Sequence, residues 1–194
     1  MKTMSVRVGL AGVALASSAL LTAACGSEGS TVVTTPASAP PSGGGATSAA
    51  KGAPASAHVG DALTIAGMDK GSKATVTVVQ VTDNATPADE FNTPPTGKRL
   101  YGVQFRIANV GTAAYDDSPS NGAKVVDVQG QSFEAAIASK ITEGASFAAQ
   151  TTIAPGDSGL GYIVFEVPAD AQITKVQFAL DSGFADQKAQ WQVG

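Results

Sequence analysis

Strict alternation of apolar and polar residues limits the possible folds of this chain more than any other feature. In Arg99–Asn109 the side chains of Tyr101, Val103, Phe105 and Ile107 would share one face of a β-strand, with smaller or polar side chains on the other. Similar segments recur from residue 58 onward between turn residues, and none shows the 3.6-residue period of an amphipathic helix. The sequence therefore predicts an all-β fold.

Eight segments are predicted as strands on this pattern. They are residues 61–65, 73–82, 99–109, 124–128, 132–136, 160–167, 173–180 and 189–193. A hairpin is expected around Gln129-Gly130, and a tight turn at 154–158, where Pro155 precedes Gly156. Residues 141–152 have no clear period. This number of short strands in residues 58–194 is typical of an antiparallel β-sandwich.

The first 24 residues predict a secretory signal peptide. A positively charged start precedes an uncharged run, Val8 to Leu21, which is short for a transmembrane helix. The run ends at Leu21-Thr22-Ala23-Ala24-Cys25, which resembles the lipobox of bacterial lipoproteins. The resemblance implies that Cys25 is lipidated and anchors the mature chain on the outer face of the cytoplasmic membrane. The alternative is an ordinary signal peptide cut near Ala24.

Residues 25–57 form the second predicted part of the chain. After Cys25 this segment is almost entirely Gly, Ser, Thr, Ala and Pro, and only Glu28 and Lys51 are charged. Such a composition provides too little apolar surface to offset the chain entropy lost on folding. We therefore expect a disordered linker, with O-glycosylation left open, between the signal peptide (1–24) and the sandwich domain (58–194).

The composition excludes several classes of function. The chain has one cysteine, Cys25, and one histidine, His58, which cannot form a closed zinc site or a Cys/His catalytic pair. Its formal net charge is −4, which disfavours binding to nucleic acid. The acidic residues do not have the spacing of a calcium-binding loop. We expect no cofactor, no metal site and no catalytic residue.

Two irregular segments, Asp83–Lys98 and Thr112–Gly122, flank the strand 99–109 and should lie at opposite ends of the domain. Loops carry most binding sites of β-sandwiches. The second segment combines an aromatic residue, Tyr115, with the carboxylates of Asp116 and Asp117. These three residues are the predicted ligand-binding site. Phe91, in the first segment, lies among prolines and is interpreted as packing over a sheet edge.

Several short motifs carry a family resemblance: Val59-Gly60-Asp61, 105–111, 126–130, Pro155-Gly156 and 161–168. Together they resemble a bacterial family of domains of unknown function with an immunoglobulin-like fold, found in secreted proteins and lipoproteins. That family is similar in fold to a secreted mycobacterial immunoprotective antigen family. The N-terminal composition also resembles that of actinobacterial lipoproteins. The resemblance implies an extracellular immunoglobulin-like β-sandwich and assigns no activity.

These inferences predict a membrane-anchored extracytoplasmic lipoprotein whose domain binds a partner without catalysis. The partner would be a protein or polysaccharide of the cell envelope, and the protein is expected to be monomeric. A structural or antigen-like envelope component without a specific ligand is the first alternative. A carboxylate-dependent hydrolase is the second, and it would require two carboxylates facing each other across a cleft.

Overall fold

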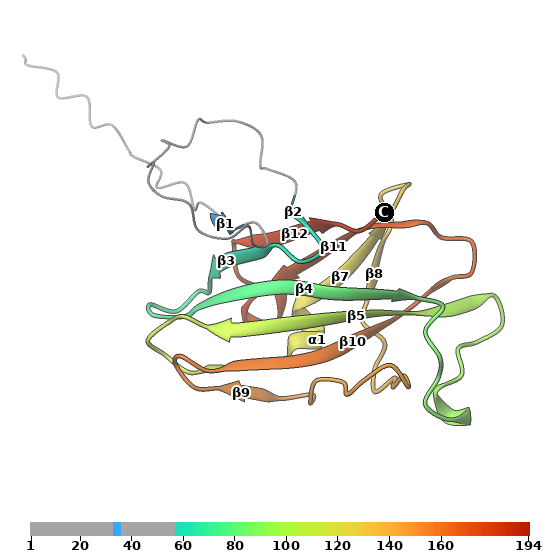
Figure 1. Cartoon of the computed structure of the whole chain (residues 1–194), viewed down its shortest axis with the longest axis horizontal. Coiled ribbons are helices and arrows are strands. Elements are labelled where there is room, and N and C mark those ends of the chain that lie inside the picture. The colour runs from blue at the N-terminus through green and yellow to red at the C-terminus, as the bar shows by residue number, and fades with distance from the viewer. Residues whose placement is uncertain (1–32, 36–56) are drawn as a thin grey trace, which may run out of the picture.

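Two five-stranded β-sheets pack face to face in the computed structural model, which describes residues 33–35 and 57–194 (Figure 1). The first sheet has the spatial order β1 (Val33–Thr35), β3 (Ala62–Ala66), β4 (Lys73–Asp83), β5 (Lys98–Asn109) and β10 (Ser158–Pro168). The second has the order β2 (Ala57–His58), β12 (Lys188–Gln192), β11 (Ile173–Ala179), β7 (Ala123–Asp127) and β8 (Ser132–Glu134).

Short elements complete the fold. A two-stranded ribbon consists of β6 (Tyr115–Asp117) and β9 (Thr151–Ile153). One helical turn, α1 (Pro119–Gly122), precedes β7, and two 3₁₀ turns are η1 (Glu90–Asn92) and η2 (Asp181–Gly183). The predicted all-β sandwich is confirmed, and all eight predicted strands are present with ends shifted by two residues at most.

Two predictions about the chain before residue 58 need correction. Val33–Thr35 was predicted as disordered linker, but it forms β1 and pairs antiparallel with Ala62–Thr64 of β3. The edge of β3 provides the unpaired backbone groups that this pairing uses. The domain also begins one residue earlier than predicted, because Ala57 is buried and pairs with Trp191. The predicted signal peptide, Cys25 and the rest of the predicted linker lie outside the described residues.

The core lies between the two sheets and follows from the alternation in the sequence. In β5 the even-numbered neighbours face outward, while Val103, Phe105 and Ile107 are fully buried. The ring of Phe105 packs against Phe178, with ring centroids 5.3 Å apart, and meets Trp191 edge-on at 6.3 Å. These large aromatic contacts join the first sheet to the second and fix their relative position.

A smaller hydrophobic cluster lies on the outer face of the first sheet. It consists of Ala85, Leu100, Ile141, Tyr162 and Val164. The irregular segment 135–147 brings Ile141 to this face and runs along the free edge of β10, where it forms single bridges to β10 at two places. The sheet edge is thus covered in part by the chain itself, which is a common protection against unwanted strand pairing.

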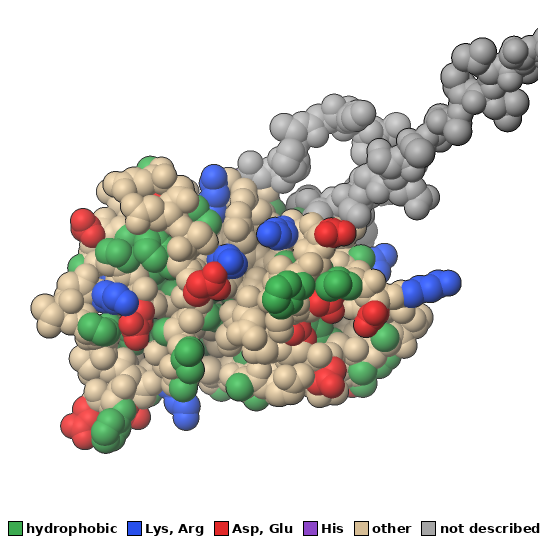
Figure 2. Space-filling model, turned by 180° about the vertical axis from the view of Figure 1, so that it is seen from behind, with side chains coloured by type: hydrophobic (Ala, Val, Ile, Leu, Met, Phe, Trp, Pro, Cys, Tyr) green, Lys and Arg blue, Asp and Glu red, His purple; other side chains and the backbone are tan. Residues whose placement is uncertain are grey.

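The two irregular segments lie at opposite ends of β5, as predicted (Figure 1). Figure 2 shows acidic and basic side chains interspersed over one face of the domain, without a basic patch on that face. Among the described residues, no helix is long and apolar enough to span a membrane.

Candidate functional site

Tyr115, the proposed aromatic anchor, is not on the surface. It is the first residue of β6, pairs with Ile153 of β9, and has only 7% of its surface exposed. Because side chains alternate along a strand, Tyr115 and Asp117 point inward and Asp116 points outward. The prediction that Tyr115 is an exposed recognition residue is therefore wrong: a three-residue strand, too short to show a period in the sequence, buries it.

Asp117 is buried and holds a neighbouring turn in place. Its carboxylate accepts hydrogen bonds from the backbone N–H of Ser118 (2.7 Å), from the backbone N–H of Ser182 (2.9 Å) and from the Ser182 hydroxyl (2.6 Å). Asp181 and Ser182 both have positive φ angles, 54° and 53°, which only surrounding contacts can maintain. Asp117 therefore stabilises η2 and does not face solvent as a ligand-binding group.

Asp116 is the one member of the predicted site that lies on the surface. It accepts hydrogen bonds from Gln150 Nε2 (2.8 Å) and Thr152 Oγ1 (3.1 Å), which lower the pKa of its carboxyl group. The buried phenol of Tyr115 behaves in the opposite way. Desolvation and the negative charges of Asp117 and Asp181 raise its pKa well above the ordinary value.

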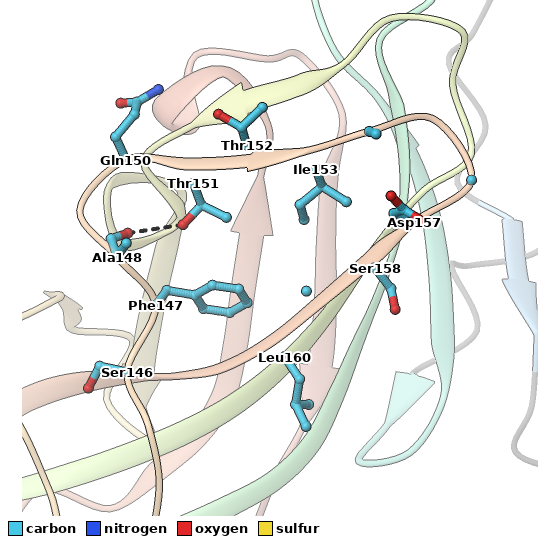
Figure 3. Close-up of a pocket in the computed structure, with 13 residues that line it drawn as sticks. Ser146, Phe147, Ala148, Gln150, Thr151, Thr152, Ile153, Asp157, Ser158 and Leu160 are labelled. Atoms are coloured by element: carbon cyan, nitrogen blue, oxygen red, sulfur yellow. Dashed lines mark hydrogen bonds between the residues drawn. The ribbon is translucent and has the colours of Figure 1, made fainter.

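A shallow groove lies between β9 and the first residues of β10 (Figure 3). Its volume is about 780 Å³. The side chains of Phe147 and Ile153 point into the space between the two strands and form its floor (Figure 3). Leu160, with 48% of its surface exposed, lies on the β10 side. We name this surface, lined by residues 146–148, 150–154 and 156–160, the β9–β10 groove.

Asn109 separates the two strands where the groove is closed. Its side-chain Nδ2 donates to the Ile153 carbonyl oxygen (2.9 Å), while its backbone N–H donates to the Asp157 carbonyl oxygen (2.9 Å). The tight turn between the strands is the one predicted, because Asp157 N–H donates to Ala154 O and Gly156 has a φ of 88°. With Asn109 between them, β9 and β10 do not pair as a regular hairpin.

Glycines in β10 make room for the floor of the groove. A Cβ atom on Gly161 would lie 2.9 Å from the Phe147 ring, and one on Gly159 would lie 3.1 Å from it. Any larger residue would displace Phe147. Phe147, Ile153 and Leu160 were not among the predicted site residues, although Gly161 within the predicted strand 160–167 and Gly159 just before it indicate close approach of another group.

Phe91, unlike Tyr115, has an exposed side chain. It lies in η1, and 89% of its surface is exposed. Asp89 Oδ1 accepts hydrogen bonds from the backbone N–H groups of Phe91 (2.9 Å) and Asn92 (3.1 Å), and Asn92 Oδ1 accepts one from Lys140 N–H (2.7 Å). The interpretation of Phe91 as packing over an edge is wrong, because the loop is fixed by its backbone and leaves the ring in solvent.

The described residues contain no group of three or more His, Cys, Asp or Glu side chains placed to hold a metal ion. The groove lining includes one carboxylate, that of Asp157. His58 is exposed, and its backbone N–H donates to Asp61 Oδ2 (2.9 Å). The groove therefore presents an apolar floor, polar rims and one negative charge.

Solved structures that are similar to this chain come from several bacteria. The secreted protein MPT63 of Mycobacterium tuberculosis matches with a TM-score of 0.53 and 13% identity, over 72% of this chain and 98% of that one. The yjhA protein of Bacillus subtilis matches with a TM-score of 0.49 and 13% identity, over 71% and 99%. An uncharacterized β-sandwich protein of Clostridium difficile matches with a TM-score of 0.40 and 12% identity, over 75% and 99%.

The likeness to MPT63 confirms the fold expected from the resemblance to a secreted mycobacterial antigen family. No curated protein matches the chain. Residues 67–189, from the end of β3 to β12, match the family described as a domain of unknown function, DUF4352. This match covers more than half of the chain and contains both walls of the β9–β10 groove, and the chain belongs to the DUF4352 family.

Proposed function

We propose that this protein is an extracytoplasmic lipoprotein whose sandwich domain binds a protein of the cell envelope through the β9–β10 groove. The observation that supports binding is the groove itself. It combines an apolar floor with backbone and side-chain polar groups on both rims, which is the general make-up of a recognition site.

The same geometry gives no support to hydrolysis. Acid–base hydrolysis by carboxylates needs two such groups across one cleft, one of them with a raised pKa. The groove lining contains Asp157 as its one carboxylate, and the nearby Asp116 has a lowered pKa. A module without catalysis is therefore the function that we propose.

The anchor is proposed on the lipobox-like sequence that ends at Cys25. MPT63, a protein with the same fold, is secreted, which agrees with an extracytoplasmic place for this chain. Cys25→Ser should abolish incorporation of a palmitate analogue and move the protein out of the membrane fraction. Equal labelling of the wild type and the variant would overturn the lipid anchor.

Binding is tested by blocking the groove. Ala148 is exposed and lines the groove, so Ala148→Trp should obstruct it with little effect on the fold. Ala114→Trp is the matched control, because Ala114 is also exposed but does not line the groove. Cross-linking in intact cells should give a specific adduct with the wild type and Ala114→Trp, and lose it with Ala148→Trp.

The outcome also separates the proposal from a structural or antigen-like role. A structural component without a ligand would give no saturable adduct with any of these chains. An adduct that persists in Ala148→Trp would place the binding surface elsewhere on the domain.

A further inference from the structure

Part of β10 lies at the edge of its sheet without a partner strand. Elsewhere along this edge the chain covers β10 with its own backbone. Ala136 N–H donates to Val164 O (2.8 Å), Tyr162 N–H donates to Ala145 O (2.9 Å), and Phe147 N–H donates to Tyr162 O (3.1 Å). This cover ends at Phe147. The residues of β10 before Gly161 therefore border the groove and are not covered by the backbone of this segment.

The direction of the backbone groups of Leu160 follows from these bonds. In an antiparallel ladder, successive residues direct their N–H and C=O groups to alternate sides. Tyr162 directs both groups away from β5, so Leu160, two residues earlier, directs both of its groups to the same side, into the groove. Within the part of the chain that the structure describes, neither group of Leu160 has a hydrogen-bond partner.

An N–H and a C=O on one residue at a sheet edge match the backbone of an extended peptide. Strand addition satisfies both groups at once, and side-chain pockets beside the edge add specificity. Here the floor of Phe147 and Ile153 lies directly beside the open edge, because these two side chains occupy the space that a side chain on Gly159 would take. A small or β-branched apolar side chain on the peptide would fit against this floor.

The charges near the groove indicate which charge the peptide should carry. Asp157 lies at the closed end of the groove, and the exposed carboxylate of Asp116 lies across β9, hydrogen-bonded to the groove residues Gln150 and Thr152. The lining contains neither lysine nor arginine. Arg106 of β5, the cross-strand neighbour of Leu160, is exposed on the outer face of the sheet. A basic residue on the peptide would therefore meet negative charge at the closed end, beside Asp157.

We propose that the β9–β10 groove takes an extended, basic segment of its partner protein, which pairs with Leu160 as a short added strand and places an apolar side chain on Phe147 and Ile153. This inference rests on the proposed function and names its ligand class. The bound segment would continue the cover that residues 135–147 already give to the rest of β10.

The first test uses capped hexapeptides in which valine alternates with serine and one end carries lysine. Their binding to the full chain in detergent is measured by titration calorimetry. N-methylation of alternate residues removes the donors on one edge of the peptide, and we expect one of the two methylated forms to bind at least about tenfold more weakly. Replacement of lysine by glutamate should weaken binding further at low salt.

Amide hydrogen exchange of the unsubstituted chain gives the second test, which does not depend on the folding of any variant. The Leu160 amide should exchange quickly in the free protein and slow at least about tenfold when the lysine peptide saturates it. Gly161 is the internal control, because its amide faces β5 and should stay protected in both states.

Absence of binding by every peptide in the series, or unchanged Leu160 exchange at saturation, would overturn strand addition. Its failure is distinguishable from failure of the proposed function. If Ala148→Trp abolishes the cellular adduct while Leu160 exchange does not change, the groove is the binding site but its ligand is not an added strand. If the adduct survives Ala148→Trp, the proposed function itself is wrong.

Discussion

The two long connections at the ends of β5 share one short sequence feature but differ in structure. Each contains one aromatic residue beside two carboxylates: Tyr115 precedes Asp116 and Asp117, and Phe91 follows Asp89 and Glu90. Tyr115 has 7% of its surface exposed, whereas Phe91 has 89% exposed. An aromatic residue beside acidic ones therefore does not distinguish a surface anchor from a core residue.

Pairing partners explain the difference. Tyr115 lies in β6, which pairs with β9, a strand more than thirty residues later in the chain, and this pairing turns the ring into the core. Phe91 lies in a 3₁₀ turn whose backbone is held by the carboxylate of Asp89, a local contact that leaves the ring outside. The comparison teaches that a distant strand, more than local composition, decides which of the two loops has a buried aromatic.

The largest expected effect comes from Tyr115→Ala. Removal of a buried aromatic ring leaves a cavity beside Ile153 and should lower the free energy of unfolding by about 3–5 kcal/mol, as large-to-small core substitutions do. Urea unfolding of the full chain with Cys25→Ser measures this. A loss below about 1 kcal/mol would show that the ring of Tyr115 is not part of the core, and the comparison would fail.

Asp117→Ala should have the next largest effect. The substitution leaves the Ser118 and Ser182 donors without their acceptor next to a turn with positive φ angles, and a loss of about 1–3 kcal/mol is expected for unsatisfied buried groups. Asp116→Ala is the matched control, because its side chain is exposed, and it should change the unfolding midpoint much less. Equal losses in the two variants would contradict the inward and outward alternation of β6.

Tyr115 and Asp117 also show which parts of the fold could be predicted from the sequence. Seven of the eight predicted strands have five or more residues in the structure, so that both faces could be recognised, and the short β8 was indicated by the hairpin signal at Gln129-Gly130. β6 and β9 have three residues each, which is too few for a period, so the burial of Tyr115 and Asp117 could not be predicted. Their positions depend on long-range pairing.

The β9–β10 groove could not be predicted either, because much of it is built from segments that are too short or too irregular to show a period. One local feature of the sequence did point to it. Its walls come from β9, which was not predicted, and from the start of β10, and its floor from Phe147 in a segment without a period. Gly159 and Gly161, on either side of Leu160, were the local indication that another side chain approaches this strand. The polar separator Asn109 had no recognisable sequence signature.

Tyr115→Phe should act in the opposite direction from Tyr115→Ala. The Tyr115 hydroxyl is buried without a hydrogen-bond partner among the described residues, so its removal should raise the free energy of unfolding by about 1 kcal/mol. A decrease of similar size would show that the hydroxyl makes a stabilising contact. Circular dichroism during urea unfolding is sufficient for this measurement.

The same variant should reduce the alkaline sensitivity of the fold. The phenol has a pKa of 10.0 when unfolded, and burial raises it in the folded state. Its contribution to stability is thus complete below pH 10 and is lost as the pH rises further, because the unfolded chain releases a proton that the folded chain retains. Burial also raises the pKa of Tyr101, to about 12. Tyr101 therefore adds a similar decrease of the free energy of unfolding with rising pH, and this decrease should remain in Tyr115→Phe.

Phe91→Ala should have the smallest effect on stability, and it tests the other side of the comparison. The ring makes little buried contact, so the free energy of unfolding should change by no more than about 0.5 kcal/mol. Asp89→Ala is the informative control, since it keeps the ring but removes the acceptor for the backbone N–H groups of Phe91 and Asn92, and caps of this kind contribute about 0.5–2 kcal/mol. The larger loss should therefore come from the acidic residue and not from the aromatic one, which is the reverse of the order expected if Phe91 packed over the sheet edge. A greater loss with Phe91→Ala than with Asp89→Ala would mean that the ring is covered in solution, and the contrast between the two loops would disappear.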